Sequence, residues 1–323
     1  MAGRLIISLD FELMWGVRDH RSAEDYGDAV LGGRQAIPRM LALFERFGIR
    51  ATWAAVGLLF ARNRDEMWLY SPSTRPEYAH ETLSPYPDLN QIGQDESEAP
   101  LYFGRSLLDR IAQTDGQEIA SHTYGHIYAL EPGMTQAAWH ADLMAAQAIA
   151  NQAGHRLTSI VFPRNQFSET HVRAARDCGM TAWRGVPTGQ VYRSRAEHEL
   201  SLPIRAARFL DGALPLLGTQ AAPPVQARNG SLDVPASRFL RPWSARWPLY
   251  SLLHQKRIIT EMTHAAQSGK HYHLWWHPHN MGRNIEQNCA QLTTLLESFQ
   301  KLRDLYGFQS ASMADIAKQE GVF

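Results

Sequence analysis

The chain has 323 residues, of which 44% are hydrophobic and 20% are charged, values that are ordinary for a globular protein. A chain of this length can bury enough surface to fold without a disulfide or a structural metal. Its 32 basic residues balance its 32 acidic residues, which argues against nucleic acid or an anionic bilayer as the partner.

Neither a membrane span nor an export signal is predicted. The longest uncharged apolar stretch, 51–61, is far shorter than the roughly 20 residues that cross a bilayer. The N-terminal segment reaches the acidic Asp10 without the apolar core of a secretory signal, so we expect a cytoplasmic protein. In that compartment Cys178 and Cys289 are expected to be reduced thiols. The sequence makes no prediction of the oligomeric state.

Short apolar runs alternate along the chain with stretches of helical period, which predicts an α/β fold with parallel strands. Strands are predicted at 4–10, 50–56, 117–121, 158–162, 180–183 and 272–276, with 308–312 as a candidate to close the set. Helices are predicted at 36–47, 101–114, 135–153 and 168–178, and also after 272–276, where apolar residues recur at helical spacing. Thr135 suits an N-cap and Gly154 a C-terminal stop.

Two long segments, 62–100 and 188–248, interrupt this alternation. Both contain several prolines and aromatic residues, and neither has the composition of a disordered linker. Each is either a wall or lid of a functional site or peripheral cover for the core, and the pattern does not decide between these. We therefore predict a single domain over 1–323 with insertions at these two segments.

Polar side chains follow four of the predicted strands where each strand ends: Asp10 and Glu12, then His122 and His126, then Arg164, and last His277. Because active sites of parallel α/β folds form at the carboxyl ends of the strands, we expect these side chains to meet at one edge. No phosphate-binding loop, dinucleotide fingerprint or nucleophile elbow is present in the sequence. These acids and histidines, with Arg164, are therefore the candidate catalytic residues.

Histidine spacing alone is weak support for a site. The 14 histidines include two pairs at four-residue spacing, His122/His126 and His273/His277, where about 0.6 pairs are expected by chance. The second pair is also explained as one face of a strand, since alternate strand residues point the same way. The convergence of four strand ends, rather than any single pair, indicates a site.

The residue types predict metal-assisted hydrolysis. Two neutral imidazoles and one carboxylate hold zinc while leaving positions open for water and substrate, and a second carboxylate and a histidine serve as general base and acid. The predicted roles are Glu12, His122 and His126 as metal ligands, Asp10 as base, His277 as acid, and Arg164 as the cation that keeps Asp10 ionised. The same ligand set suits ferrous iron, so the identity of the metal stays open.

Five segments, in order along residues 4–279, resemble the motifs of the polysaccharide deacetylases, carbohydrate esterase family four. They are S-L-D-F-E, A-T-W-A-A-V-G, I-A-S-H-T-Y-G-H, F-P-R-N-Q and L-W-W-H, and the third, with its paired histidines, is the most specific. The resemblance implies a distorted (β/α) barrel of about seven parallel strands. It also implies a hydrolase that removes acetyl from N-acetylated sugars with a divalent metal.

Three positions depart from the family pattern. Phe11 separates the two acids of the first motif, where the common form has adjacent aspartates. The segment T-A-W-R-G has Trp183 and Arg184 where an acid that orients the catalytic histidine is expected. His277 and His279 both suit the acid role, and we prefer His277 because it directly ends the strand.

The predicted partner is an N-acylated sugar, nucleotide- or lipid-linked, in the assembly of a surface polysaccharide such as O-antigen. Trp15 and Trp275 are candidates to contact the sugar ring, although tryptophans more often pack in cores, and Asn165 and His279 are candidates for polar contacts. Two other hypotheses stay open. One is a non-catalytic carbohydrate-binding relative that kept the fold, and the other is a hydrolase of a small cyclic amide or ureide.

Overall fold

A curled sheet forms the centre of the molecule. The computed structural model describes residues 3–226 and 230–322, and within them ten strands form one sheet in the order β6-β7-β5-β4-β3-β2-β1-β9-β8, with β10 paired to β1. Every pairing is parallel except that of β6 with β7. The strands are β1 (Arg4–Phe11), β2 (Ala51–Ala55), β3 (Gln117–Ser121), β4 (Ser159–Ile160), β5 (Ala182–Trp183), β6 (Val225–Gln226), β7 (Leu232–Asp233), β8 (Arg238–Phe239), β9 (Tyr272–Trp276) and β10 (Gln309–Ala311). This half-barrel confirms the predicted α/β fold and distorted barrel.

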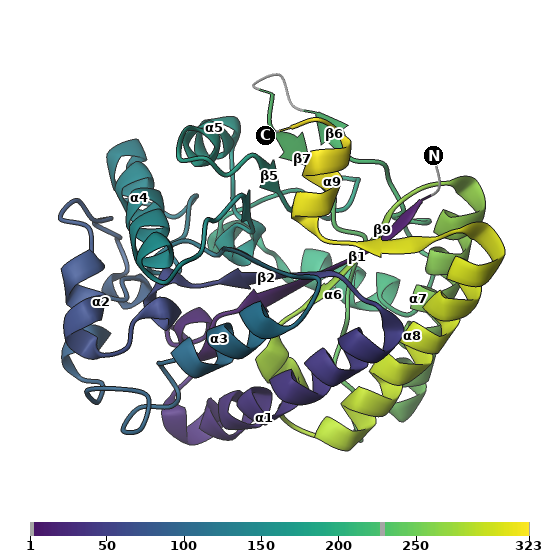
Figure 1. The fold of residues 1–323 in the computed structure, drawn as a ribbon, viewed down its shortest axis with the longest axis horizontal. Helices are drawn as coiled ribbons and strands as arrows, with labels where there is room; N and C mark the ends of the chain where they lie inside the picture. Colours follow the sequence, from purple (N-terminus) through teal and green to yellow (C-terminus); the bar gives the residue numbers. More distant parts are fainter. Residues whose placement is uncertain (1–2, 227–229, 323) are drawn as a thin grey trace.

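Helices surround the sheet (Figure 1). They are α1 (Ala23–Phe47), α2 (Arg64–Tyr70), α3 (Arg105–Gln113), α4 (Gln136–Gln152), α5 (Glu169–Asp177), α6 (Leu202–Asp211), α7 (Pro248–Ser268), α8 (Ile285–Tyr306) and α9 (Met313–Gln319). The long helix α1 packs between α3 and α8, and α8 packs in turn on α7. None of the described helices is long and apolar enough to cross a membrane.

The alternation of side chains along β1 determines which groups reach the barrel interior. The odd-numbered residues from Leu5 to Phe11 are buried in the main apolar core. Ile6 faces the other way and belongs to a separate inner cluster. Ser8 Oγ lies 2.8 Å from His273 Nε2 on β9, so it also faces the interior. Asp10, two residues further along, therefore points into the same space.

The interior is apolar at the amino ends of the strands, where α9 closes it. Ala54, Ala120 and Ile6 pack there with Met313 and Ile316 of α9. The start of α9 is fixed by hydrogen bonds from Met313 N to Thr52 Oγ1 and from Ala314 N to Glu118 Oε2, both 2.9 Å. The polar side chains of the predicted site therefore lie at the opposite end, at the carboxyl ends of the strands.

Most predicted elements are confirmed, with differences in length. The predicted strands at 117–121 and 272–276 coincide with β3 and β9, and Thr135 caps α4 by accepting from Ala138 N at 3.1 Å. The predicted start of the first helix at 36 is wrong, because a capping box formed by Ser22 and Asp25 begins α1 at residue 23. The pattern predicts no helix at 248–268, where α7 forms.

The segment 188–248 contributes to the barrel wall. It contains α6, β6, β7 and β8, and its residues 234–237 run between the two ends of the sheet. Ala236 N donates to Gly185 O, just after β5, at 3.0 Å, and Ser237 N donates to His273 O on β9 at 2.8 Å. Of the two alternatives for this segment, these bonds favour a wall over peripheral cover. The segment 62–100 contains α2 and two short 3₁₀ helices, Glu81–Leu83 and Asp88–Asn90, and is otherwise irregular.

Candidate metal centre and active site

Three buried side chains form a group that could hold a metal ion. Glu12 follows β1, His122 and His126 follow β3, and their ligand atoms all lie within 4.8 Å of one another. Glu12 Oε2 is 3.3 Å from His122 Nε2 and 3.0 Å from His126 Nε2. His122 Nδ1 lies 2.8 Å from the carbonyl oxygen of Val161, a contact that assigns the imidazole proton to Nδ1 and leaves Nε2 free to act as a ligand. The residues present therefore fit a divalent ion.

A tight loop after β3 brings the two histidines together. Asp142 on α4 is fully buried, and its carboxylate accepts from the backbone N–H groups of Tyr124 at 2.6 Å and Gly125 at 3.1 Å. Thr123 and His126 have φ angles of 63° and 54°, a left-handed conformation that is costly for residues with a side chain. Asp142 therefore stabilises a strained loop that presents both imidazoles.

Gly16 makes room for the carboxylate of Glu12. A Cβ atom at position 16 would overlap the Glu12 carboxyl group, so any larger residue there would displace it. Glu12 precedes a short 3₁₀ turn, Leu13–Gly16, which starts with a hydrogen bond of 3.0 Å from Trp15 N to Glu12 O. The position of this ligand therefore depends on the turn that follows β1.

The surroundings favour the protonation state that binds a cation. Burial raises the pKa of Glu12, but the neighbouring imidazoles, His277 and His126 foremost, outweigh it and hold the pKa well below its usual value. Burial lowers the pKa of His126, which favours the neutral imidazole that a metal requires. An ionised Glu12 thus faces the ring of His126, whose neutral form is favoured by burial.

Asp10 is paired with an arginine from β5. The fully buried Arg184 donates from Nη1 and Nη2 to the two carboxylate oxygens of Asp10, at 2.5 and 2.8 Å. Burial raises the pKa of Asp10, but the charge and hydrogen bonds of Arg184 outweigh it, so the pKa lies below its usual value. Arg184 also donates to Asn165 Oδ1 at 3.1 Å, which fixes the guanidinium in the barrel interior.

The predicted pairing of Arg164 with Asp10 is wrong. Arg164 forms an ion pair with Asp19 and lies over the ring of Tyr128, 4.2 Å from its centre. Burial opposes ionisation of Asp19, but hydrogen bonding by His20 and the charge of Arg164 outweigh it and lower the pKa to about 2. The physical reason is that Arg184, crossing the interior, already occupies both oxygens of Asp10.

His277 and His279 follow β9 with their rings stacked, 5.1 Å between centres, but in different surroundings. His277 Nε2 lies 3.7 Å from both Asp10 Oδ2 and Glu12 Oε1, and the side chain is 23% exposed. His279 is buried, and burial lowers its pKa to about 3. His277 therefore lies close to Asp10 and Glu12 and is also partly exposed to solvent, whereas His279 is not exposed.

Asn280 lies where it can orient His277. Its Nδ2 is 3.4 Å from His277 Nδ1. With the amide in this orientation Nδ1 accepts, so the proton of a neutral His277 lies on Nε2, the atom that faces Asp10. An amide, rather than an acid, therefore contacts the Nδ1 atom of His277.

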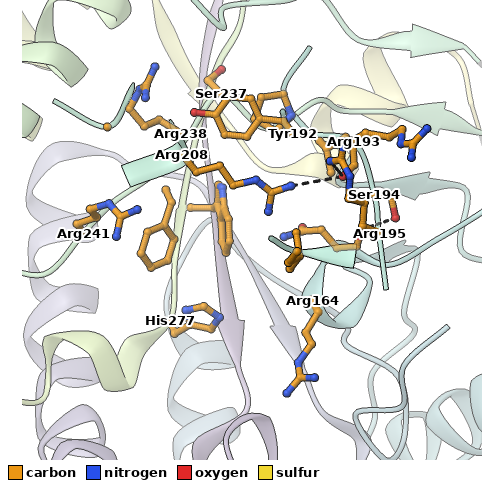
Figure 2. A pocket seen from close by; sticks show the side chains of 17 residues that line it. Arg164, Tyr192, Arg193, Ser194, Arg195, Arg208, Ser237, Arg238, Arg241 and His277 are labelled. Carbon is orange, nitrogen blue, oxygen red and sulfur yellow. Dashed lines mark hydrogen bonds between the residues drawn. The ribbon is translucent and has the colours of Figure 1, made fainter. Parts of the chain in front are cut away.

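The candidates for contact with substrate divide into two groups. Trp15 is fully buried, and its Nε1 donates to Tyr102 O at 2.8 Å, so the prediction that this ring contacts substrate is wrong. Trp275 and Asn165 both line a cavity of about 280 Å³. The cavity also includes His277, and Figure 2 shows this histidine at one end of the arginine-rich wall supplied by 188–248.

Sequence reasoning misses three residues that position the site. Arg184 is noted as a departure from the family pattern but receives no role, and Asn280 and Asp142 are not singled out. The signal for Asn280 is its place two residues after Pro278, which stops β9. Asp142 carries the weaker signal of an acid on the buried face of a predicted helix.

Comparisons with known proteins agree with the fold. A model of the polysaccharide deacetylase family matches residues 25–183. A protein from Mycobacterium smegmatis, described as a polysaccharide deacetylase, has a TM-score of 0.62 at 13% identity, covering 99% of this chain and 91% of that one. A protein from Pseudomonas aeruginosa PAO1 with the same description has a TM-score of 0.56 at 13% identity, with coverage of 99% and 91%.

The Puue allantoinase is also similar, with a TM-score of 0.55 at 13% identity, covering 98% of this chain and 88% of that one. Identities this low establish the fold alone. No curated protein is significantly similar to the chain in sequence. The family model spans β2, β3 and β4 and the loops that carry His122, His126 and Arg164, and the half-barrel places Glu12 against both histidines. On these grounds, the chain belongs to the polysaccharide deacetylase family.

Proposed function

We propose that the protein is a metal-dependent hydrolase that removes an acyl group, acetyl in the simplest case, from the nitrogen of an amino sugar. The observation that carries this proposal is the adjacency of two buried groups. The ligand set Glu12, His122 and His126 lies beside an ionised Asp10, and His277 reaches both from the edge of a cavity.

The donor set supports a divalent ion, and we propose zinc. Two imidazoles and one carboxylate are ligands that zinc prefers at catalytic sites, while ferrous iron is the alternative that the same donors accept. When bound, the metal would supply Lewis acidity to the acyl carbonyl and would lower the pKa of the attacking water. The buried carboxylate of Glu12, kept ionised by the neighbouring imidazoles, is the charge that would hold it.

The chain's own residues supply the proton transfers. Asp10 is kept ionised by Arg184 and would accept the proton of the attacking water, which makes it the general base. His277, with Nε2 3.7 Å from Asp10 Oδ2 and its edge on the cavity, would deliver a proton to the departing amine. Asn280 would hold the ring of His277 in the orientation that this step needs.

The test is acyl release from N-acetylated amino sugars by the metal-loaded protein, with allantoin as the competing substrate class. Asp10→Asn is expected to lower turnover by about a hundredfold or more, because the general base is lost. The metal is expected to stay bound in this variant. His122→Ala is expected to lose both metal and turnover. His264→Ala removes an exposed histidine on α7 and is expected to change neither.

Three results would contradict the proposal. Full turnover in Asp10→Asn would overturn the role of the base. Hydrolysis of allantoin without release from any sugar would favour a ureide hydrolase. Sugar binding with no acyl release, unaffected by chelator, would favour the non-catalytic relative.

A further inference from the structure

The cavity beside His277 has an unusually basic wall. Six of the residues that line its volume of about 280 Å³ are arginines, and no carboxylate is among the described residues that line it. The arginines are Arg164, Arg193, Arg195, Arg208, Arg238 and Arg241. A concave site of one charge sign attracts ligands of the opposite sign. The chain has no net charge, so this concentration of positive charge is local.

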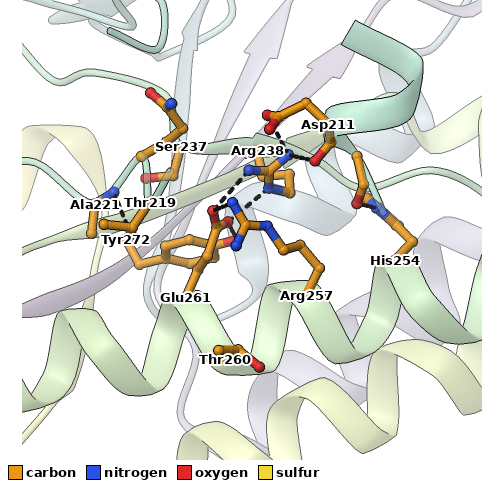
Figure 3. Close-up of polar contacts among 12 residues, drawn as sticks. Asp211, Thr219, Ala221, Ser237, Arg238, His254, Arg257, Thr260, Glu261 and Tyr272 are labelled. Carbon is orange, nitrogen blue, oxygen red and sulfur yellow. Dashed lines mark hydrogen bonds and ion pairs between the residues drawn. The ribbon is translucent and has the colours of Figure 1, made fainter. Parts of the chain in front are cut away.

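Two of these arginines are neutralised by neighbours outside the cavity. Arg164 pairs with Asp19, and Figure 2 shows its guanidinium turned away from the other arginines. Arg238 donates to both oxygens of Glu261 at 2.7 and 2.8 Å and to Asp211 Oδ2 at 3.2 Å. Figure 3 shows this buried network between the wall and α7. These two cations hold the structure together and are not available to a ligand.

The remaining arginines keep their charge uncompensated. Among the described residues, Arg193, Arg195, Arg208 and Arg241 form no ion pair with a carboxylate. Arg208 Nε donates at 2.9 Å to the carbonyl oxygen of Val191, a neutral acceptor that orients the guanidinium without neutralising it. Burial, followed by the charge of Arg195, lowers the pKa of Arg208.

These cations lie within reach of the proposed reaction centre. Arg208 and Arg241 share the cavity wall with His277, whose Nε2 is 3.7 Å from Asp10 Oδ2. Figure 2 shows Arg208 extending across the cavity, with Arg241 and His277 around it. Phe239 and Trp275, with ring centres 4.7 Å apart, supply an apolar surface between the cations and the acid-base residues. One ligand could therefore place an anion on the arginines and a sugar ring toward Asp10.

We propose that the substrate is a sugar that carries a phosphate ester, and that Arg208 and Arg241, assisted by Arg193 and Arg195, bind that phosphate. This inference rests on the proposed hydrolase function and names its substrate class. Guanidinium groups donate paired hydrogen bonds to phosphate oxygens, and several guanidiniums from separate segments suit a group with several acceptor oxygens. A nucleoside diphosphate sugar and a lipid-linked sugar diphosphate share this chemistry.

The first test is binding, measured by titration calorimetry with N-acetylglucosamine 1-phosphate and with neutral N-acetylglucosamine. We expect the wild type to bind the phosphorylated probe at least about tenfold more tightly, the effect of one charge-assisted hydrogen bond. Arg208→Gln and Arg241→Gln are each expected to remove most of this preference and to leave affinity for the neutral sugar unchanged. The matched control is Arg173→Gln, an exposed arginine on α5.

The same titration on His122→Ala separates the two proposals. This variant lacks a metal ligand, so phosphate binding that persists in it comes from the arginines and not from a metal. A wild type that prefers the phosphorylated probe but releases no acyl group from any sugar would support the anion site and contradict the hydrolase. Equal affinity for both probes, or a preference that survives Arg208→Gln and Arg241→Gln in proteins that melt like the wild type, would overturn the anion site.

Two further probes identify the source of the phosphate. UDP-N-acetylglucosamine and farnesyl-diphosphate-linked N-acetylglucosamine carry the same sugar and diphosphate but differ in the group beyond it. Tighter binding of the first than of the sugar 1-phosphate assigns a nucleotide-linked substrate, and tighter binding of the second assigns a lipid-linked one. Weaker binding of both than of the neutral sugar would contradict the proposal.

Discussion

At the scale of single residues, the charge on Asp10 depends on Arg184. Two guanidinium nitrogens donate to the two oxygens of this buried carboxylate, and the same nitrogens also donate to Ser8 and Asn165. The guanidinium lowers the pKa of Asp10 against the opposing effect of burial. The proposed general base must be ionised to work, so the lower limit of the pH range for turnover would be set by this contact.

Replacing Arg184 is therefore expected to move the pH profile. Without the guanidinium the pKa of Asp10 rises, so the acidic limb of the kcat/KM profile shifts to higher pH in Arg184→Gln and by less in Arg184→Lys, which keeps the charge. Breaking a buried pair also lowers the free energy of unfolding, by about 3 kcal/mol. Arg164→Gln, which loses the pair with Asp19 instead, is expected to leave the acidic limb in place. A shift in Arg164→Gln and none in Arg184→Gln would reverse this assignment.

The places of Glu12 and His122 in the fold are predictable from sequence because each follows a strand directly, and Asp10 lies just before the end of β1. Glu12 and His122 are found by locating a strand end, and side-chain alternation then aims them inward. Arg184 is not predictable in the same way. It lies 174 positions from Asp10 and reaches it only across the barrel interior, so its role depends on how far the sheet curls. Arg164 also follows a strand, but its backbone has a φ of 53° and its side chain pairs with Asp19.

At the scale of elements, α1 positions the turn that follows His277, the proposed acid. Gly33 of α1 packs directly against η7, the 3₁₀ turn Pro278–Met281, and Gly32 packs against Gly282, which ends that turn. A Cβ atom at position 33 would lie 2.7 Å from the Cα of His279, a distance that real Cβ contacts do not show. Two glycines inside a long helix cost helix stability, and their close contact with this turn is the structural reason for them.

Gly33→Ala is expected to displace the turn and lower turnover through the position of His277. The free energy of unfolding is expected to fall by about 1–3 kcal/mol, as for other overpacked sites. Gly27→Ala serves as the control, because a Cβ atom there meets only the side chain of Leu101, at an ordinary 3.5 Å. The checks are kcat and urea denaturation of both variants. Unchanged kcat and stability in Gly33→Ala would show that the turn tolerates displacement.

Element boundaries are predictable where local signals are strong. The strand at 117–121 is bounded by polar residues, and the helix at 136–152 starts at a threonine cap. The glycines within α1 hide its helical period, which is why its first half is not predicted. The helix α7 begins at Pro248. In the sequence this residue is the last of several prolines in an irregular segment, so the pattern does not predict a helix there. Proline is nevertheless well suited to a first helical position.

At the scale of the whole molecule, buried neutral histidines link stability to pH. Burial lowers the pKa of His254 to about 4 and that of His273 to about 3. Both ring nitrogens of each are engaged: His254 bonds to Gly212 O at 2.7 Å and to Arg241 N at 3.1 Å. The unfolded chain takes up a proton below about pH 6.5, where the native ring does not. Stability is therefore lost as the pH falls from 6.5 toward 4.

The free energy of unfolding is expected to fall by about 1 kcal/mol per pH unit for each such histidine in this range. Urea denaturation between pH 7 and pH 4.5 measures the slope. His254→Gln is expected to have lower stability at pH 7 and a shallower slope, whereas His264→Gln, at an exposed position, is expected to keep the wild-type slope. Equal slopes in the wild type and His254→Gln would contradict the linkage.

The overall architecture is predictable because alternating strands and helices have few solutions, and parallel strands require crossover helices. The closure of the half-barrel is not. It depends on bonds from Ala236 and Ser237 to Gly185 and His273, which join segments far apart in the chain. The basic cavity is also not predictable from the sequence. The chain has zero net charge, and the cavity is assembled by α6, β8 and the loops beside them.

The central claim, a divalent metal held by Glu12, His122 and His126, is tested most directly by elemental analysis of the tag-free protein. We predict close to one equivalent of a divalent metal per chain in the wild type and in Asp10→Asn. Glu12→Gln and His122→Ala are expected to retain little of it, and His264→Ala all of it. A wild type that carries no metal and takes up none from added zinc, or ligand variants that keep the full equivalent, would contradict the account.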